Sequence, residues 1–415
     1  MSIDRPDDTD DLPTLRPLPP EEREALERDY GEPPPDERDG QRRDFREPPP
    51  RRRPRFGFWL AVLWSLLYFV ATQVVFGVVF AILIYGIALI PEFREHGMDA
   101  LDPDRLNAWL QTPPAHVATL CIVGASQVAG LGLSWLLLRL VIGRAWKRKV
   151  ALTRGPTLTH WVLVLIGMPA LLALGAVVEI PIRRYVPALP DVLKRLGLPD
   201  LGPEGTTEMI AKLISDTPWV LALFVIGVTP AVCEEVFCRG YLAAGLSGRY
   251  RAWAVVLIVS FLFGCLHGDP QQGLGAMCLG TAIHGTFIAT RSLWAAMFVH
   301  WANNSIAVVH FHPRLFPVLD PYEQALEKAP LPIPILFAVT AILLFAAVAY
   351  ALYQTRCKLV SFDPARPAWR PEGVSSVELP PPDSGTVVTH DPISSVSVGL
   401  VLIAAAAFGV VLAFA

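Results

Sequence analysis

Three short polar groups interrupt apolar stretches of this 415-residue chain. In chain order they read Glu234-Glu235-Val-Phe-Cys-Arg239, Phe263-Gly-Cys-Leu-His267 and His300-Trp-Ala-Asn303-Asn304. An ionisable side chain near the centre of a membrane costs at least about 2.5 kcal/mol, so such residues usually have a function. A surplus carboxylate, two imidazoles and an amide can move protons and stabilise charge. We interpret the set as a functional site.

The spacing within each group indicates which side chains hold the helices together and which are left to take part in a reaction. Glu235 and Arg239 are four residues apart and lie one above the other on a helix, so they are expected to form an ion pair. Glu234 points about 100° away from Glu235 and is the carboxylate left to act on water. His300 and Asn304 are also four residues apart, so both can face one point inside a helix bundle.

The segments that must position these groups are long and apolar. The chain is 53% hydrophobic and only 18% charged, against about 25% charged in an average soluble domain. Because about 20 apolar residues cross a bilayer, the composition excludes a soluble protein. It predicts an all-α, polytopic transmembrane helix bundle with about eight core spans and one appended C-terminal span. The apolar segments are 57–90, 115–142, 160–181, 218–247, 252–267, 272–290, 293–310, 332–354 and 396–415.

The Lys and Arg residues in short flanking loops indicate how the chain crosses the membrane, because such residues accumulate on the cytoplasmic side. They precede the first span and follow the second, fourth, sixth and eighth spans, so all of these loops lie on one side of the membrane. If that side is the cytoplasm, the amino terminus is cytoplasmic and the carboxyl terminus is external. The loop after the third span, with Arg183, Arg184, Lys194 and Arg195, is the exception. The groups that agree are Arg51, Arg52, Arg53, Arg55, Arg144, Lys147, Arg148, Lys149, Arg154, Arg249, Arg251, Arg291, Arg356 and Lys358.

Composition also divides the chain into four parts. A Pro-rich stretch with many charges cannot bury enough apolar surface to fold, so we expect it to be disordered. Apolar spans follow, and a second Pro-rich stretch separates the last span from the rest. The predicted parts are a disordered cytoplasmic tail (1–56), a transmembrane core (57–354, with the motifs in 215–310), a cytoplasmic linker (355–395) and an additional C-terminal transmembrane helix (396–415).

Glu-Glu-x-x-x-Arg, Phe-x-x-x-His and His-x-x-x-Asn, each on its own apolar segment, resemble the motifs of the CAAX protease and bacteriocin-processing (CPBP) family of intramembrane proteases. This family includes the type II CAAX prenyl endopeptidases. The resemblance covers roughly residues 215–310 and implies an all-helical core of about eight spans. It also implies endopeptidase action near the membrane surface.

The resemblance further implies a role for each matched residue. Glu234 and His267 would activate water, while His300 and Asn304 would stabilise the oxyanion. The remaining motif residues would support them: Glu235, Arg239, Phe263 and Asn303. One departure is visible, since many members have Phe directly before the motif Arg, whereas this chain has Cys238 there and Phe237 one position earlier.

A metal is the alternative to direct glutamate catalysis. Glu234, His267 and His300 are also a ligand set suited to catalytic zinc. The chain lacks the His-Glu-x-x-His helix of many zinc proteases. The sequence therefore favours a glutamic peptidase with no cofactor and leaves zinc open.

Two other classes of function remain open. Intramembrane Glu and His residues also relay protons in transporters and channels, although no internal repeat of the transporter kind is evident. A non-catalytic immunity or scaffold protein would also bind membrane peptides. We expect the partners to be the bilayer and a membrane-associated protein or peptide, lipidated or not. No nucleic-acid-binding patch is evident, and the expected location is a bacterial cell membrane.

Overall fold

The computed structural model describes residues 56–197, 206–315, 329–330 and 332–414. The tail predicted to be disordered (1–56) therefore lies outside the described residues, except for Phe56. Nearly all regular structure in the described part is helical, as the composition predicts. Two four-residue strands near the carboxyl end are the exception.

The elements follow one another along the chain, with π-helical turns inside several of the spans. In order they are α2 (Phe58–Phe69), η1 (Val70–Phe76), α3 (Gly77–Ala88), α4 (Ile90–His96), η2 (Gly97–Leu101), α5 (Pro103–Leu110), α6 (Pro113–Leu137), η3 (Leu138–Ile142), α7 (Trp146–Lys149), α8 (Leu158–Tyr185), α9 (Leu189–Arg195), α10 (Thr206–Ser215), α11 (Trp219–Ala222), η4 (Leu223–Val228), α12 (Thr229–Glu235), η5 (Val236–Leu242), α13 (Ala243–Leu246), α14 (Ala252–Cys265), α15 (Pro270–Thr290), α16 (Leu293–Phe311), α18 (Pro332–Gln354), β1 (Lys358–Ser361), η7 (Pro382–Ser384), β2 (Thr386–Thr389) and α19 (Ser395–Phe414).

Seven helical stretches in the described part are long and apolar enough to cross a membrane. They are Phe58–Ala88, Pro113–Ile142, Leu158–Arg195, Trp219–Leu246, Pro270–Thr290, Pro332–Gln354 and Ser395–Ala413. The other two predicted spans fall short for different reasons. α14 has only 14 residues, whereas α16 is a continuous helix of 19 residues whose hydropathy is lowered by His300, Asn303 and Asn304. Both helices carry the polar motifs. The chain is a polytopic helical membrane protein.

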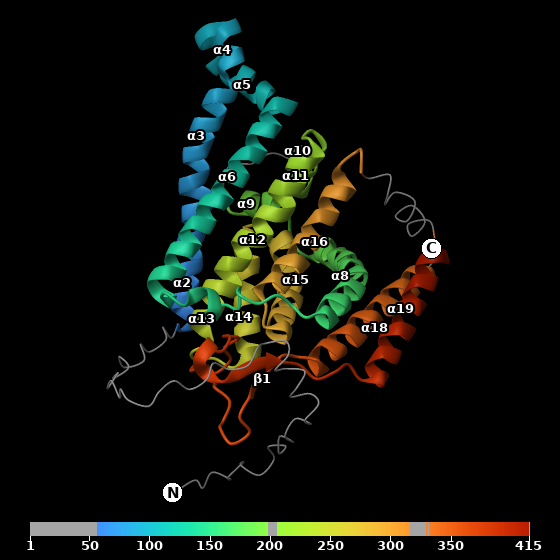
Figure 1. The fold of residues 1–415 in the computed structure, drawn as a ribbon. Helices are drawn as coiled ribbons and strands as arrows, with labels where there is room; N and C mark the ends of the chain where they lie inside the picture. The colour runs from blue at the N-terminus through green and yellow to red at the C-terminus, as the bar shows by residue number, and fades with distance from the viewer. Residues whose placement is uncertain (1–55, 198–205, 316–328, 331, 415) are drawn as a thin grey trace, which may run out of the picture.

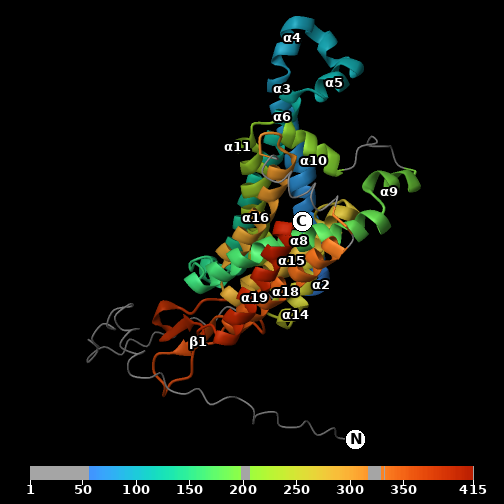
Figure 2. The same ribbon diagram turned by 90° about the vertical axis from the view of Figure 1, so that its right-hand side faces the viewer.

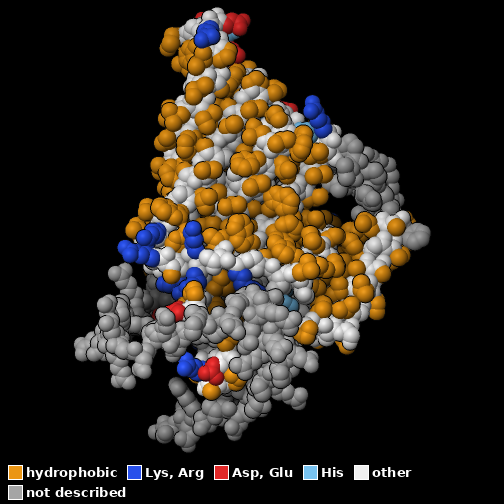
Figure 3. Space-filling model, in the orientation of Figure 1, with side chains coloured by type: hydrophobic (Ala, Val, Ile, Leu, Met, Phe, Trp, Pro, Cys, Tyr) orange, Lys and Arg blue, Asp and Glu red, His pale blue; other side chains and the backbone are white. Residues whose placement is uncertain are grey.

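The helices pack as a bundle with a side group formed by the last two. In Figure 1, α3 and α6 run side by side to the far end, where α4 and α5 project. The centre holds α12, α15 and α16. Figures 1 and 2 both place α18 and α19 against each other and beside α8. The face shown in Figure 3 is mostly hydrophobic between its two ends, as expected where lipid rather than water surrounds the protein.

The stretch 355–395, which its composition describes as a linker, has defined structure. β1 pairs with β2 as an antiparallel hairpin, with Lys358 opposite Thr389 and Ser361 opposite Thr386. The segment Ser375–Leu379, between the two strands, forms hydrogen bonds with loops of the core. Composition could not indicate these contacts, because they are made by backbone groups at loops distant in the sequence.

Candidate active site

The two glutamates lie on α12 between two π-helical turns. η4 ends directly before α12, and η5 begins directly after Glu235 and contains Arg239. A π turn holds an extra residue, and such turns often occur at functional sites. Here they set the rotation of α12 relative to the rest of its span, and so the directions of both carboxylates.

The ion pair expected from the spacing is present and fully buried. Arg239 Nη1 donates to Glu235 Oε1 at 2.7 Å, and both side chains are 0% exposed. Arg239 Nη2 donates to the carbonyl oxygen of Gly280 at 2.8 Å. A side chain at Gly280 would place its Cβ 3.3 Å from that nitrogen, so glycine allows the close approach. The guanidinium also lies 4.8 Å from the ring centroid of Phe263, a cation–π contact.

Glu235 has a second partner that its spacing did not reveal. His300 Nδ1 lies 2.9 Å from the same carboxylate oxygen that accepts from Arg239. A carboxylate accepts, so the proton of this bond is on Nδ1. His300 Nε2 then lies on the other side of the ring, 3.9 Å from Glu234 Oε2. Glu235 therefore orients His300 and directs its second nitrogen toward Glu234.

Glu234 differs from its neighbour in access to solvent. Its side chain is 25% exposed, whereas that of Glu235 is completely buried. The residues that follow on η5, from Val236 to Leu242, are all buried. Glu234 thus lies where the tightly packed part of this span ends, with its carboxylate next to His300 and open to small molecules.

His267 lies at the carboxyl end of α14, next to the turn into α15. Its Nδ1 is 3.0 Å from the backbone oxygen of Phe263, which fixes the proton on that nitrogen. In the neutral imidazole Nε2 then has no hydrogen and can accept a hydrogen bond. The ring of Phe263 has edge-to-face contacts with His267 (5.1 Å) and with His300 (5.6 Å). Phe263 therefore holds both histidines around one aromatic ring.

Asn304 lies one helical turn beyond His300, against η4. Its Nδ2 donates to the backbone oxygen of Ile226 at 3.2 Å, and its Oδ1 accepts from Asn303 Nδ2 at 3.3 Å. An amide nitrogen has two N–H bonds, so Asn304 can donate once more. Asn303 fixes which end of the Asn304 amide is the donor.

Glu234, His267 and His300 are the candidate metal ligands. Within the described ranges, no three His, Cys, Asp or Glu side chains lie close enough together to hold one ion. Glu234 and His300 are near each other, but His267 bonds to the backbone and contacts His300 only through Phe263. The arrangement of these described side chains does not fit a zinc site.

The departure from the family pattern before Arg239 affects packing only. Phe237 is fully buried and stacks on Tyr68 of the first span, with centroids 3.8 Å apart and planes 10° apart. Cys238 is also fully buried. The aromatic ring therefore joins two spans from position 237. No signal in the sequence pairs Phe237 with Tyr68.

Comparison with known proteins agrees with the motifs. Residues 216–306 match the family described as "Type II CAAX prenyl endopeptidase Rce1-like". The match begins just before α11 and ends within α16, so it spans every residue of the site described above. The chain contains an Rce1-like domain of the CPBP family. Residues before and after the Rce1-like domain lie outside the match.

One curated relative, of low sequence identity, is also described as a membrane peptidase. The "Putative membrane peptidase YdiL" of Bacillus subtilis (strain 168) is 25% identical over 118 residues, which cover 28% of this chain and 46% of that protein. The chain thus matches less than half the length of this relative. No solved structure matches. Both comparisons relate the part of the chain that holds the site to membrane peptidases.

Proposed function

We propose that this protein is an intramembrane endopeptidase that hydrolyses peptide bonds of membrane-associated or lipidated proteins and peptides. One observation carries the proposal: Glu235 bonds both Arg239 and His300, while the neighbouring Glu234 stays partly exposed beside His300. A structural ion pair alone would not require a second carboxylate in the membrane, where it is costly.

Each step of hydrolysis has a group suited to it. Glu234 takes a proton from water, and His267 Nε2 holds that water by accepting its other hydrogen. The oxygen of the water attacks the peptide carbonyl carbon, and the carbonyl oxygen becomes negative. Asn304 donates an N–H to this oxygen, and His300 donates from Nε2 whenever that nitrogen has a proton. Glu234 returns its proton to the leaving amine as the C–N bond breaks.

The experiment compares membrane proteomes of cells with the parent chain and with Glu234→Ala. Uncleaved membrane peptides are expected to accumulate in the variant. Glu179→Ala is the matched control, because Glu179 is an exposed glutamate on α8 that pairs with Arg183 outside the site. If Glu234→Ala is present at parental levels and its peptide pattern equals that of Glu179→Ala, the protein is not a peptidase under these conditions and a binding or transport role gains support.

A further inference from the structure

His284 is a buried polar side chain on α15 that takes no part in the proposed reaction. The residue is only 2% exposed, and its ring makes an edge-to-face contact with Phe287 at 5.9 Å. None of the three polar motifs contains it. A buried imidazole in a membrane span is expected to have a polar partner, because an unpaired polar group in an apolar interior is costly.

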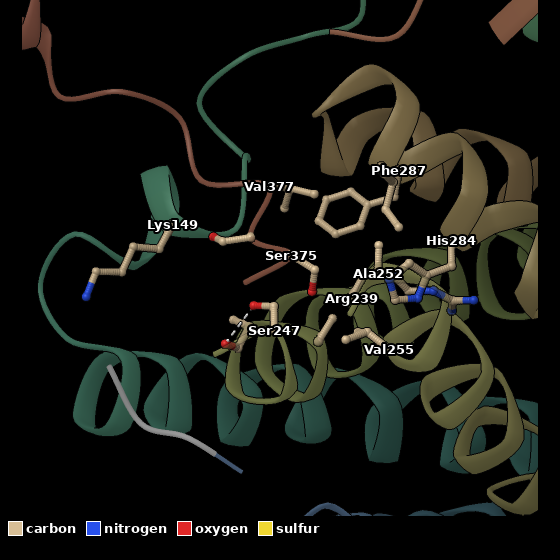
Figure 4. Close-up of a pocket in the computed structure, with 13 residues that line it drawn as sticks. Lys149, Arg239, Ser247, Ala252, Val255, His284, Phe287, Ser375 and Val377 are labelled. Carbon is tan, nitrogen blue, oxygen red and sulfur yellow. Dashed lines mark hydrogen bonds between the residues drawn. The ribbon is translucent and has the colours of Figure 1, made fainter. Parts of the chain in front are cut away.

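Helix geometry places His284 next to Arg239. Arg239 Nη2 donates to the backbone oxygen of Gly280 at 2.8 Å, and Gly280 comes one helical turn before His284 on α15. Side chains on an α-helix lean toward its amino terminus, so the imidazole of His284 lies back over the turn at Gly280. Figure 4 shows the imidazole and the guanidinium on the same side of a small pocket that both residues line.

Each of these two side chains has one buried polar atom without a protein partner. The atoms are Nε of Arg239 and Nδ1 of His284, and neither forms a hydrogen bond with any described residue. The other two guanidinium nitrogens are paired, Nη1 with Glu235 and Nη2 with Gly280. Nearly all buried polar atoms in proteins are satisfied by protein or by ordered water. Nε and Nδ1 are therefore expected to share a partner that is not a protein group.

The pocket has room for such a partner. Its volume is about 10 Å³, close to the least that one water molecule needs. A water oxygen can accept from Arg239 Nε–H, and the same water can donate to His284 Nδ1. Ser247 and Ser375 also line the pocket, and each hydroxyl donates to a backbone oxygen and keeps lone pairs that can accept. One water thus has at least the two polar partners that a buried water requires.

The opposite wall of the pocket comes from the carboxyl-terminal part of the chain. Figure 4 shows Ser375 and Val377 on the side away from His284. Ser375 N donates to the backbone oxygen of Ser247 at 3.2 Å, and Arg148 Nη2 lies 3.0 Å from the carboxylate of Glu378. This segment lies outside the Rce1-like domain. The two parts of the chain therefore enclose the pocket together.

From these observations we infer that an ordered water molecule bridges Arg239 Nε and His284 Nδ1, and that His284 is a positioning residue for the site. The guanidinium is planar, so a third hydrogen bond at Nε fixes its plane in addition to the two bonds at its ends. Arg239 in turn holds Glu235, and Glu235 orients His300. Without the bridge, the guanidinium can turn, and the direction of His300 is less well fixed. The effect on catalysis rests on the proposed function, whereas the bridge itself does not.

Three substitutions separate the water bridge from packing. In His284→Asn the amide oxygen can take the place of Nδ1 and accept from the water. In His284→Gln the amide lies one bond farther out, near the place of Nε2, and in His284→Leu no polar group remains. We expect kcat of peptide cleavage to fall at least about tenfold in His284→Leu and His284→Gln with KM unchanged, because small displacements in an active site are costly. His284→Asn is expected to retain most of the parental kcat.

A second measurement needs no substrate and uses the parent chain as well as the variants. The full chain is labelled with ¹⁵N-histidine and studied by NMR in detergent, and the signals of His284 and His300 are assigned by their loss in His284→Asn and His300→Ala. In the parent we expect His284 to have its proton on Nε2 and a hydrogen-bonded, unprotonated Nδ1. The His300 signal is expected to shift in His284→Leu and to stay near its parental position in His284→Asn.

Several results would overturn the inference. They are a proton on Nδ1 of His284 in the parent chain, an unshifted His300 signal in His284→Leu, and equal losses of kcat in the Asn and Leu variants, which would indicate packing alone. The parental His284 signal decides the matter even if His284→Leu does not fold. NMR shifts as expected in a chain that cleaves no peptide would retain the water bridge and reject proteolysis.

Discussion

Replacing Glu235 by Gln tests whether the buried Arg–Glu–His arrangement holds the site together. Gln has nearly the same shape as Glu, and its amide oxygen can still accept from Arg239 and His300. The change removes one negative charge from a place where both partners of the ion pair are 0% exposed. Among the described residues, no other carboxylate then forms an ion pair with the guanidinium of Arg239.

The expected loss of unfolding free energy follows from this burial. Removing one partner of a fully buried ion pair costs about 3–5 kcal/mol. The second carboxylate oxygen, Oε2, is buried and has no hydrogen-bond partner among the described residues. With the amide oxygen in the place of Oε1, the new NH2 would take the place of Oε2, and an unpaired buried donor costs a further 1–3 kcal/mol or so. A loss of this size is a large part of the roughly 5–15 kcal/mol that stabilises a typical protein.

The assay is reversible unfolding of the purified protein in mixed micelles of mild and denaturing detergent. Glu234→Gln is the matched control and is expected to unfold like the parent, because Glu234 is 25% exposed and only approaches His300 at 3.9 Å. Adding Arg239→Met to Glu235→Gln should restore part of the loss, since the unpaired charge is then gone. If Glu235→Gln unfolds within about 1 kcal/mol of the parent, the value typical of an exposed pair, the buried pair is not what stabilises this region.

Three more predictions concern chemistry, metal and the carboxyl-terminal segment. His300→Ala and Asn304→Ala are each expected to lower kcat by about 10²–10³-fold with little change in KM, as for a lost oxyanion donor, in a peptide-cleavage assay. Purified active protein should tolerate chelators; one equivalent of zinc, measured by elemental analysis and lost in His267→Ala, would contradict glutamate catalysis. Glu378→Ala removes the carboxylate that bonds Arg148, so limited proteolysis should cut between β1 and β2 faster than in the parent; equal rates would contradict this role.

The contacts that sequence could predict are those within one helix. Glu235 and Arg239 are four residues apart on a helical segment, so their ion pair follows from helix geometry alone. The bond between Glu235 and His300 joins two helices 65 residues apart. It depends on how each helix is rotated, and the π turns beside α12 change that rotation without any marker in the sequence.

The sequence predicted the number of spans and the structure of the carboxyl-terminal segment less well. Apolar character located α14 and α16, but the residues that make the site polar also lower the hydrophobicity of α16, and α14 is short. The segment around Glu378 is rich in Pro and Ser, like a linker. Its partners are backbone groups of Ser247, Tyr250 and Arg148 and the side chains of Arg148 and Arg291. Composition does not indicate which groups distant in the sequence will be the partners.

The position of Ser375–Leu379 in the chain has a consequence for biosynthesis. Every helix that contributes a side chain to the site is synthesised before this segment, and α19 follows it. While a ribosome is still adding the residues of α19, the helices of the site can already be in the membrane and packed against one another. Because chains fold in the order of their synthesis, the segment that lines the pocket beside Arg239 is among the last parts to take its place. A newly made molecule therefore passes through a stage in which the loop between α13 and α14 lacks its hydrogen bonds with this segment.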